Sequence, residues 1–539
     1  MKRVTYYVNG TTGCDSNPGT SPERPFKTLA AVNALTLEPG DRVLLSRGCT
    51  FENQYLHVSA QGTQEAPIVI GAYGEGTLPH IKAQGTGLWY QNYGQPLDNP
   101  NHVWHGYVSS AVLLYDCEYL CLRDLEISND PGLLPGERYN QGDKMNRTGV
   151  AVVAQNRGTL HGITLTGLFV HDVKGNVYDK HLANGGIYCV CQKPEDENGA
   201  IARYEDLQIT HCRVERCSRW GIAAGYSYTH GQFTGLYLPE ETVKTYGHTG
   251  VVIENCFVRD IGGDGITPMY CYKPLVQRNV SENIATEIND RVYTEEGPRL
   301  GKTAAAMWPW KCKDAVFQYN EAYHTCLNQD GQAWDADSGD GTVYQYNYSH
   351  GNGGGCVMFC LGESVNNTFR YNISFLDGDG IINPCENPDA HIYGNTFILA
   401  PDVPFVRHNM SGGHMLVENN LIVNLGPQPV FCDWHHQTGH ASYRGNVYVG
   451  FENAPEEDGD ALVLPVGTKV LQDALSGPRE TQGVIQPRSA FKGFRPAIEW
   501  GKPREETGEQ DFFGNPALSH QIGASRQQIH AHRSIDRVK

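Results

Sequence analysis

The chain has 539 residues and a formal net charge of −18 at pH 7; 40% of its residues are hydrophobic and 19% are charged, with 61 Gly and 29 Tyr. This composition is typical of a globular protein with a large core, and no run of apolar residues is long enough to predict a transmembrane helix, which argues against a membrane partner. The negative charge argues against a nucleic-acid partner, because phosphates would be repelled. The first residues lack the apolar core of a secretory signal, and the 16 Cys lack metal-type spacing, so we expect a cytoplasmic protein with reduced thiols.

The N-terminal segment carries a recognisable pattern. Residues 6–35 read YYVNGTTGCDSNPGTSPERPFKTLAAVNAL. This segment resembles the N-terminal signature of the pectate-lyase-like β-helix superfamily, in which the Asp-Ser-Asn-Pro-Gly-Thr turn and Pro-Phe-Lys-Thr lead into a capping helix. The resemblance implies a helix over residues 27–36 that closes the open end of the core. It implies the fold more than the reaction, because this superfamily includes lyases, hydrolases, epimerases and adhesins.

A repeat runs through the middle of the chain. Its units are 23 to 27 residues long, apart from one of 41, and each has a short strand-like segment marked by an Asn: Asn255, Asn279, Asn320, Asn347, Asn372, Asn395, Asn420 and Asn446. Stacked units of this length, rich in Val, Ile and Tyr between Gly and Asn, predict an all-β, right-handed parallel β-helix. We expect three strands in each coil and a stack of Asn side chains at one turn. The predicted β-helix covers residues 1–450, with the cap in about the first 45, and residues 451–539 form a C-terminal cap.

Four longer segments interrupt the repeat, at residues 131–148, 171–184, 229–249 and 284–303. Loops inserted into repeat proteins tend to gather on one face, which is often the binding face. We therefore expect a walled pocket rather than an open groove. A pocket suits the removal of a terminal sugar.

A second motif follows the Asn position and can be aligned on a Gly: WGIAAGYSY from residue 220, DGITPMYC from 264, DGQAWDAD from 330, GGCVMFCL from 354 and DGIINPCE from 379. Side chains alternate between the two faces of a strand, and the residue after the Gly is mostly apolar. The alignment therefore places Asp335, Asp337, Phe359 and Glu386 on the outer face of one sheet. Asp335 and Asp337 would lie roughly 6.5 Å apart at their Cα atoms. Glu363, which leaves the strand of the intervening coil, can lean toward the same point.

Aromatic residues accompany these acids on the preceding coil. Trp308 and Trp310 align beside Asp335, and an aromatic face beside acids is the usual platform for a pyranose ring. Mutual repulsion raises the pKa of at least one carboxyl group, as a general acid near neutral pH requires. The predicted substrate-binding residues are Trp308, Trp310, Lys311, Asp340, Phe359 and Glu386.

Three aspartates have a structural interpretation. Asp264, Asp330 and Asp379 each precede a Gly, and a recurring turn explains all three, because Asp bonds its own backbone there. His324 and His350 fall near the Asn stack on another strand and are interpreted as turn or surface residues.

A calcium site is an alternative use of the remaining aspartates. Asp335, Asp337 and Asp340 resemble a calcium loop, although the spacing is one residue too long for the helical type and its final Glu is missing. A calcium-assisted polysaccharide lyase, with Lys or Arg as its base, is therefore one alternative function. A carbohydrate-binding β-helix without enzymatic activity is another.

The sequence as a whole favours a glycoside hydrolase that acts on an oligosaccharide. It is similar in kind to the β-helix xylosidases and fucosidases, which use paired Asp and Glu residues on one outer face. We predict Asp335 and Asp337 as the central catalytic pair and Glu363 as the proton donor, with no cofactor and with calcium left open. The sugar, the linkage, retention or inversion at the anomeric carbon, and assembly into a homo-oligomer also stay open.

Overall fold

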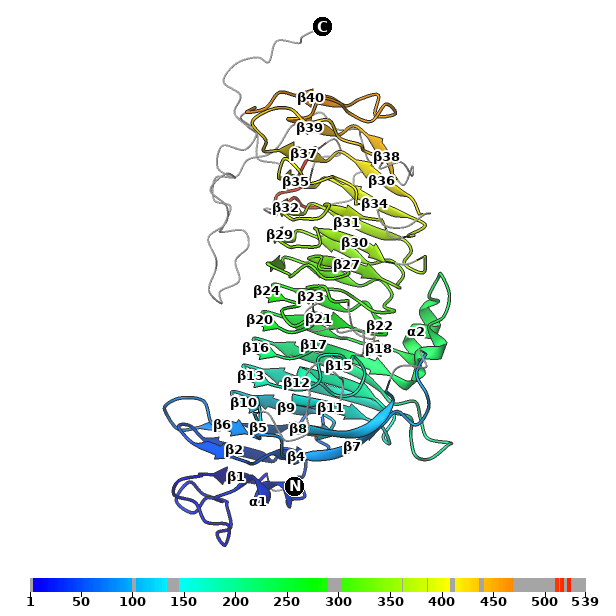
Figure 1. The fold of residues 1–539 in the computed structure, drawn as a ribbon. Coiled ribbons are helices and arrows are strands. Elements are labelled where there is room, and N and C mark those ends of the chain that lie inside the picture. Colours follow the sequence, from blue (N-terminus) through cyan, green and yellow to red (C-terminus); the bar gives the residue numbers. More distant parts are fainter. Residues whose placement is uncertain are drawn as a thin grey trace.

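The protein is an elongated stack of short strands (Figure 1). The computed structural model describes residues 3–98, 103–132, 145–288, 303–360, 362–384, 386–407, 413–435, 441–468, 509–512, 514–517 and 521–524. Successive strands of the chain visit three faces in turn, and almost all pair in parallel with the equivalent strand of the next coil. The predicted all-β, parallel β-helix fold is confirmed.

The first face is a 16-stranded sheet: β1 (Thr5–Val8), β2 (Arg42–Ser46), β5 (Ile68–Tyr73), β9 (Leu120–Arg123), β12 (Thr159–Thr166), β15 (Arg203–Thr210), β18 (His248–Thr249), β19 (Val252–Glu254), β22 (Cys271–Tyr272), β23 (Leu275–Gln277), β25 (Val316–Gln318), β28 (Val343–Gln345), β31 (Asn367–Arg370), β34 (Ala390–Tyr393), β36 (Met415–Glu418) and β38 (Ala441–Arg444). The second face is a 14-stranded sheet: β3 (Thr50–Glu52), β6 (His80–Lys82), β10 (Glu126–Asn129), β13 (Phe169–Val173), β16 (Arg213–Cys217), β20 (Phe257–Ile261), β24 (Val280–Ile284), β26 (Glu321–Tyr323), β29 (Tyr348–His350), β32 (Ile373–Phe375), β35 (Thr396–Leu399), β37 (Leu421–Asn424), β39 (Val447–Val449) and β40 (Leu462–Leu464).

The third face carries two sheets. The first has seven strands: β4 (Leu56–Val58), β7 (Leu88–Asn92), β8 (His105–Tyr115), β11 (Arg147–Ala154), β14 (Gly185–Cys191), β17 (Trp220–Ser227) and β21 (Asp264–Pro268). The second has three: β27 (Trp334–Asp337), β30 (Val357–Cys360) and β33 (Ile382–Asn383). Isolated bridges of Met307 and Trp310 join β21 to β27 across the gap between the sheets.

Alternate residues of the third face point into the core. The register aligns one inward column whose members are all fully buried: Ile222, Ile266, Met307, Trp334, Val357 and Ile382. Burial of a large apolar side chain contributes about 1.5–3 kcal/mol, so such a column strongly favours one register. A slip by a single residue would turn the whole strand inside out.

The predicted Asn stack is present at one turn. From Asn279 to Asn446, each side-chain amide donates to the Oδ1 of the next Asn along the stack, at 3.0–3.1 Å. Asp458 ends the row by accepting from Asn446. These side chains are buried, and each also satisfies backbone groups of its neighbours, which explains why Asn recurs at this position from Asn279 onward.

Asn255 was wrongly included in this stack. The register pairs Phe257 with Val280, so Cys256 is the residue opposite Asn279, and its backbone N–H donates to Asn279 Oδ1. Cys256 therefore holds the position in this coil that Asn255 was expected to hold. Asn255 instead has φ 53°, a left-handed conformation that Asn adopts more readily than most residues. Both positions favour Asn, for different reasons, and they are adjacent.

The described residues contain three short helical segments. Helix α1 (Leu29–Asn33) lies inside the predicted range of residues 27–36 and buries Leu29 and Val32 in the core. The helices α2 (Glu240–Tyr246) and η1 (Tyr228–Gln232) belong to the insertion at residues 229–249. Among the described residues, no helix is sufficiently long and apolar to cross a membrane.

Candidate active site

A pocket opens on the third face, where β17 and β21 meet β27 and β30. Its cavity volume is about 310 Å³, in the lower part of the range for small-molecule sites. Its lining comes from at least five coils: Lys180, His181, Trp220, Tyr226, Met269, Thr303, Trp308, Trp310, Asp330, Asp337 and Cys360.

Two carboxyl groups line this pocket. Asp337 ends β27, and Asp330 lies in the turn before that strand. Burial raises the pKa of Asp337 to about 7, with the negative charge of Asp330 acting in the same direction. Burial also raises the pKa of Asp330 to about 6, against the opposing effect of Lys180. Near neutral pH the pair therefore holds a proton, which is the state that acid–base catalysis by two carboxyl groups needs.

A cation lies beside the two acids. The Nζ of Lys180 is 3.6 Å from Asp264 Oδ2 and donates to Thr303 Oγ1 at 3.3 Å. Burial lowers the pKa of Lys180, and the charge of Arg219 acts in the same direction. The Asp264 carboxylate and, more weakly, Asp330 and Asp337 act in the opposite direction. Lys180 is therefore the cation that partly compensates the negative charge in the pocket.

Asp264 organises the wall behind Lys180. It is fully buried, accepts from Arg219 at 2.5 Å, and accepts from the indole Nε1 of Trp308 at 3.0 Å. It also accepts from the backbone of Ala305 at 3.1 Å. The sequence suggested only a turn role for Asp264, because it precedes a Gly. In the structure its carboxylate also fixes Trp308 and pairs with the buried Arg219.

Aromatic rings form the apolar side of the pocket. The rings of Trp220 and Trp308 lie 6.1 Å apart at 31°, and Trp310 stands at 87° to Trp308. The Nε1 of Trp310 donates to Tyr270, which fixes the ring plane. Such surfaces can pack against the C–H groups of a sugar ring, while the acids face its oxygens.

The structure brings together part of the predicted site. Asp335 and Asp337 lie on the same side of β27, and their carboxylate oxygens, together with the Sγ of Cys360, all lie within 4.8 Å of one another. Asp335 is only 3% exposed and lies outside the pocket lining. Trp308 and Trp310, which the alignment placed beside Asp335, line the pocket with Asp337.

Phe359 is a correction. The strand register pairs it with Ala336, and it is fully buried in the core, so it cannot form part of a substrate-binding surface. The alignment on Gly355 was one residue out, because Val357 of β30 follows Gly355 by two residues, whereas Trp334, its partner in β27, follows Gly331 by three. Met358, not Phe359, is the outward neighbour of Asp335, and Cys360 is the outward neighbour of Asp337. The slip exchanged the two faces of the strand.

The remaining predicted residues lie around the pocket rather than in its lining. Glu363 is about half-exposed and forms an ion pair with Lys311, whose charge lowers the pKa of Asp337 from outside the lining. Glu386 is exposed beside Cys360. Asp340 is buried and bonded to Lys313 at 2.8 Å, to the backbone of Leu238 and to Asn366, so both of its oxygens are engaged by these partners.

Sequence reasoning missed the residues that reach the pocket from earlier coils. Asp330 was interpreted as a turn residue only, although it faces the cavity. Lys180 and His181 lie in the insertion at residues 171–184, and the insertion that ends at residue 303 supplies Thr303. The insertions were the available signal, but nothing in their sequences indicated which side chains point into the cavity.

The acids of β27 also bear on the calcium alternative. Calcium takes six to eight oxygen ligands, whereas the group of Asp335, Asp337 and Cys360 offers two carboxylates and a thiol. Asp340, the third acid of the loop-like spacing, is bonded elsewhere. The donor set of these described residues therefore fits calcium poorly.

Comparison with known proteins finds lacto-N-biosidases among the relatives of this chain. It is 38% identical over 570 aligned positions to a lacto-N-biosidase of Bifidobacterium longum subsp. longum, with 95% of this chain and 36% of that protein covered. The chain thus spans about a third of the length of this curated relative. Two crystal structures of the GH136 lacto-N-biosidase from Eubacterium ramulus, native and selenomethionine-substituted, are each 57% identical, with a TM-score of 0.76 over 78% of this chain and 67% of that chain. No family model matches the chain.

Proposed function

Because the chain belongs to the glycoside hydrolase family GH136, we propose that it is a glycosidase that removes a terminal unit from an oligosaccharide and uses Asp330 and Asp337 as its two reacting carboxyl groups. The observation that carries this proposal is the presence of both acids, with raised pKa values, in one pocket with tryptophan walls. Asp335 and Glu363 are the partners of Asp337 that the sequence favoured. Asp335 lies close to Asp337 but outside the pocket lining, and Glu363 is paired with Lys311.

The chemistry needs one protonated and one ionised carboxyl group. The protonated member donates its proton to the glycosidic oxygen as the bond from that oxygen to the anomeric carbon breaks. The ionised member either attacks the anomeric carbon or takes a proton from the attacking water. In both routes one water is added across the bond, and no oxidant or reductant is required. Lys180 balances part of the charge that the pair carries.

The substrate proposal rests on the relatives and on the shape of the site. Both relatives are lacto-N-biosidases, which supports a lacto-N-biose unit as the terminal piece. The small pocket with aromatic walls suits the end of an oligosaccharide rather than the middle of a polymer. The net charge of −18 is compatible with a neutral sugar.

A direct assay separates this function from the lyase alternative. With 4-nitrophenyl lacto-N-bioside, the purified chain is expected to release nitrophenol and a reducing disaccharide at the same rate with and without EDTA, because the two acids need no metal. Panels of other nitrophenyl glycosides and a uronate polymer serve as comparisons. An unsaturated uronate product that disappears on chelation would replace the hydrolase proposal with the lyase.

Trp310 is expected to contribute to sugar binding. Its ring lines the pocket beside Asp337, so Trp310→Ala should raise KM about tenfold, equivalent to about 1.4 kcal/mol, with a smaller effect on kcat. Trp89→Ala is the matched control, because the Trp89 indole is bonded to Ser110 on an earlier coil. Equal KM values for both variants would remove Trp310 from the binding surface.

A further inference from the structure

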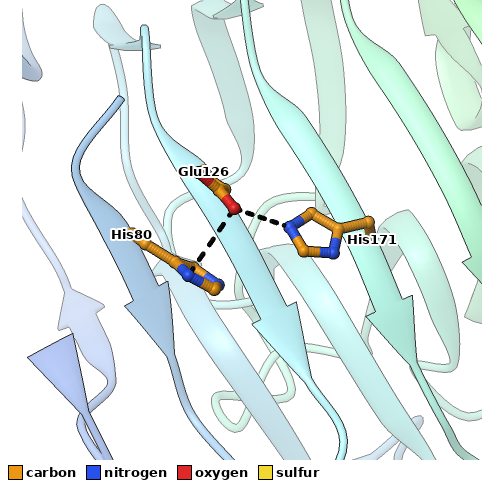
Figure 2. A group of neighbouring side chains, drawn as sticks. All are labelled: His80, Glu126 and His171. Atoms are coloured by element: carbon orange, nitrogen blue, oxygen red, sulfur yellow. Dashed lines mark hydrogen bonds and ion pairs between the residues drawn. The ribbon is translucent and has the colours of Figure 1, made fainter. Parts of the chain in front are cut away.

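We propose that His80, Glu126 and His171 form a binding site for a divalent transition-metal ion, with Zn²⁺ as the expected occupant. The three residues come from the neighbouring strands β6, β10 and β13 of the second face, whereas the pocket lies on the third (Figure 2). One ligand atom of each residue lies within 4.8 Å of the other two. The proposal does not depend on the hydrolase function.

The spacing of the donors fits a zinc ion. Glu126 Oε1 lies 3.6 Å from His80 Nδ1 and 3.0 Å from His171 Nε2. Two donors at about 2.0–2.1 Å from a tetrahedral zinc are about 3.3 Å apart, so only small side-chain shifts would admit the ion. Two imidazoles and one carboxylate are an established zinc donor set, and imidazole disfavours calcium and magnesium.

The strand register creates this arrangement. His80 and Glu126 are direct partners across β6 and β10, and Ser128, two residues after Glu126, is the partner of His171 across β10 and β13. The three side chains therefore project from the same face of the sheet, as Figure 2 shows. Their positions depend on the backbone of the β-helix rather than on a loop.

Contacts behind the ligands orient both imidazoles. His171 Nδ1 lies 2.7 Å from Asp172 Oδ2, and Arg216 holds that carboxylate through two contacts of 2.7 and 2.9 Å. His80 Nε2 lies 2.7 Å from Ser128 Oγ. With a proton on each of these nitrogens, the opposite nitrogen of each ring offers its lone pair toward Glu126. Zinc-binding histidines commonly have such a partner on the second ring nitrogen.

Solvent can reach the site. The side chains of His80, Glu126 and His171 are 17%, 25% and 11% exposed. An ion can therefore enter, and water can complete its coordination. On the next coil of the same face, a glutamate has a different kind of partner. Glu215 there is paired with two arginines, Arg213 and Arg216. A pair of histidines in place of arginine leaves nitrogen lone pairs that can bind a metal.

The first test is metal titration of the full chain. After dialysis against EDTA and removal of the chelator, calorimetric titration with Zn²⁺ should show one equivalent bound, and Zn²⁺ should raise Tm. Co²⁺ in place of zinc should give the visible absorption of a tetrahedral site with nitrogen and oxygen ligands. Absence of stoichiometric Zn²⁺ binding would overturn the proposal and leave a hydrogen-bonded His–Glu cluster.

Variants identify the ligands. His171→Gln and Glu126→Gln should each weaken Zn²⁺ binding at least about 100-fold, and Asp172→Asn, which positions His171, about 10–100-fold. His161→Gln, on the first face, is the matched control and should bind as the parent does. Glu126→Gln is nearly isosteric, so it tests the site even if a histidine variant does not fold. Unchanged affinity in both ligand variants, or Zn²⁺ binding lost only with Cys360→Ser, would place the ion elsewhere and contradict the proposal.

Discussion

Asp337→Asn is expected to reduce kcat/KM for hydrolysis of the lacto-N-bioside by at least about 1,000-fold, and Asp330→Asn should have an effect of similar size. Each change keeps the shape of the side chain but removes the group that donates, accepts or attacks. The two effects should not add in the double variant, because the two carboxyl groups act as one unit. Steady-state kinetics of the three variants, with Asp260→Asn on the second face as control, measure this.

The pH dependence gives an independent signature of the pair. Because the pKa values are about 6 for Asp330 and about 7 for Asp337, the singly protonated state is most populated between pH 6 and 7, where kcat/KM should peak. Below this range both acids are protonated, and above it both are ionised. A flat profile from pH 5 to about 8 would contradict the assignment.

The raised pKa of Asp337 also affects the stability of the folded chain. The folded-state pKa of Asp337 is raised above its ordinary value of 3.8, so the folded chain loses stability relative to the unfolded chain as pH rises from about 4 to about 7. The Asn variant has no such loss. Asp337→Asn should therefore raise Tm relative to the parent at pH 8 and change it less at pH 4. Loss of activity with a lowered Tm at pH 8 would instead indicate damage to the fold.

Asp264→Ala is expected to destabilise the protein by about 3–5 kcal/mol, because it leaves the charge of Arg219 buried without its carboxylate. The change also removes the acceptor of the Trp308 indole and of the Ala305 amide. Since Trp308 lines the pocket, activity should fall as well, even in conditions where the variant is folded. The free energy of unfolding in urea and the activity of the folded fraction measure the two effects.

Asp260→Ala is the matched control for Asp264. Asp260 is partly exposed, pairs with Arg259 at 3.4 Å and accepts a hydrogen bond from Asn283, so Asp260→Ala should cost only about 1–2 kcal/mol. Asp264→Asn separates the loss of the charge pair with Arg219 from the loss of the hydrogen bond to Trp308, because it removes the charge but keeps an acceptor for Trp308. A loss of less than about 1 kcal/mol in Asp264→Ala would show that Arg219 finds other partners.

Part of the site could be predicted because it depends on short-range geometry. Asp335 and Asp337 are two residues apart on one strand, and alternation places them on the same side whatever the rest of the chain does. The Asn stack follows from a repeat that stays within a few residues of constant length. Phe359 shows the limit of this reasoning, since a difference of one residue between the aligned Gly and the strand exchanged the inner and outer faces in the alignment.

The sequence by itself determined the architecture of this protein, because the period, the buried Asn row and the alternation of apolar residues leave a stacked β-helix as the fold that buries them all. Only the tertiary structure decided the membership of the pocket. Lys180 and Trp220 reach Asp330 and Asp337 through insertions and coils far away in the chain, and their side-chain directions depend on packing rather than on spacing. The same packing gives Asp330 its place in the cavity, where burial raises its pKa and distinguishes it from Asp379, which precedes a Gly in the same way but is paired with Arg407.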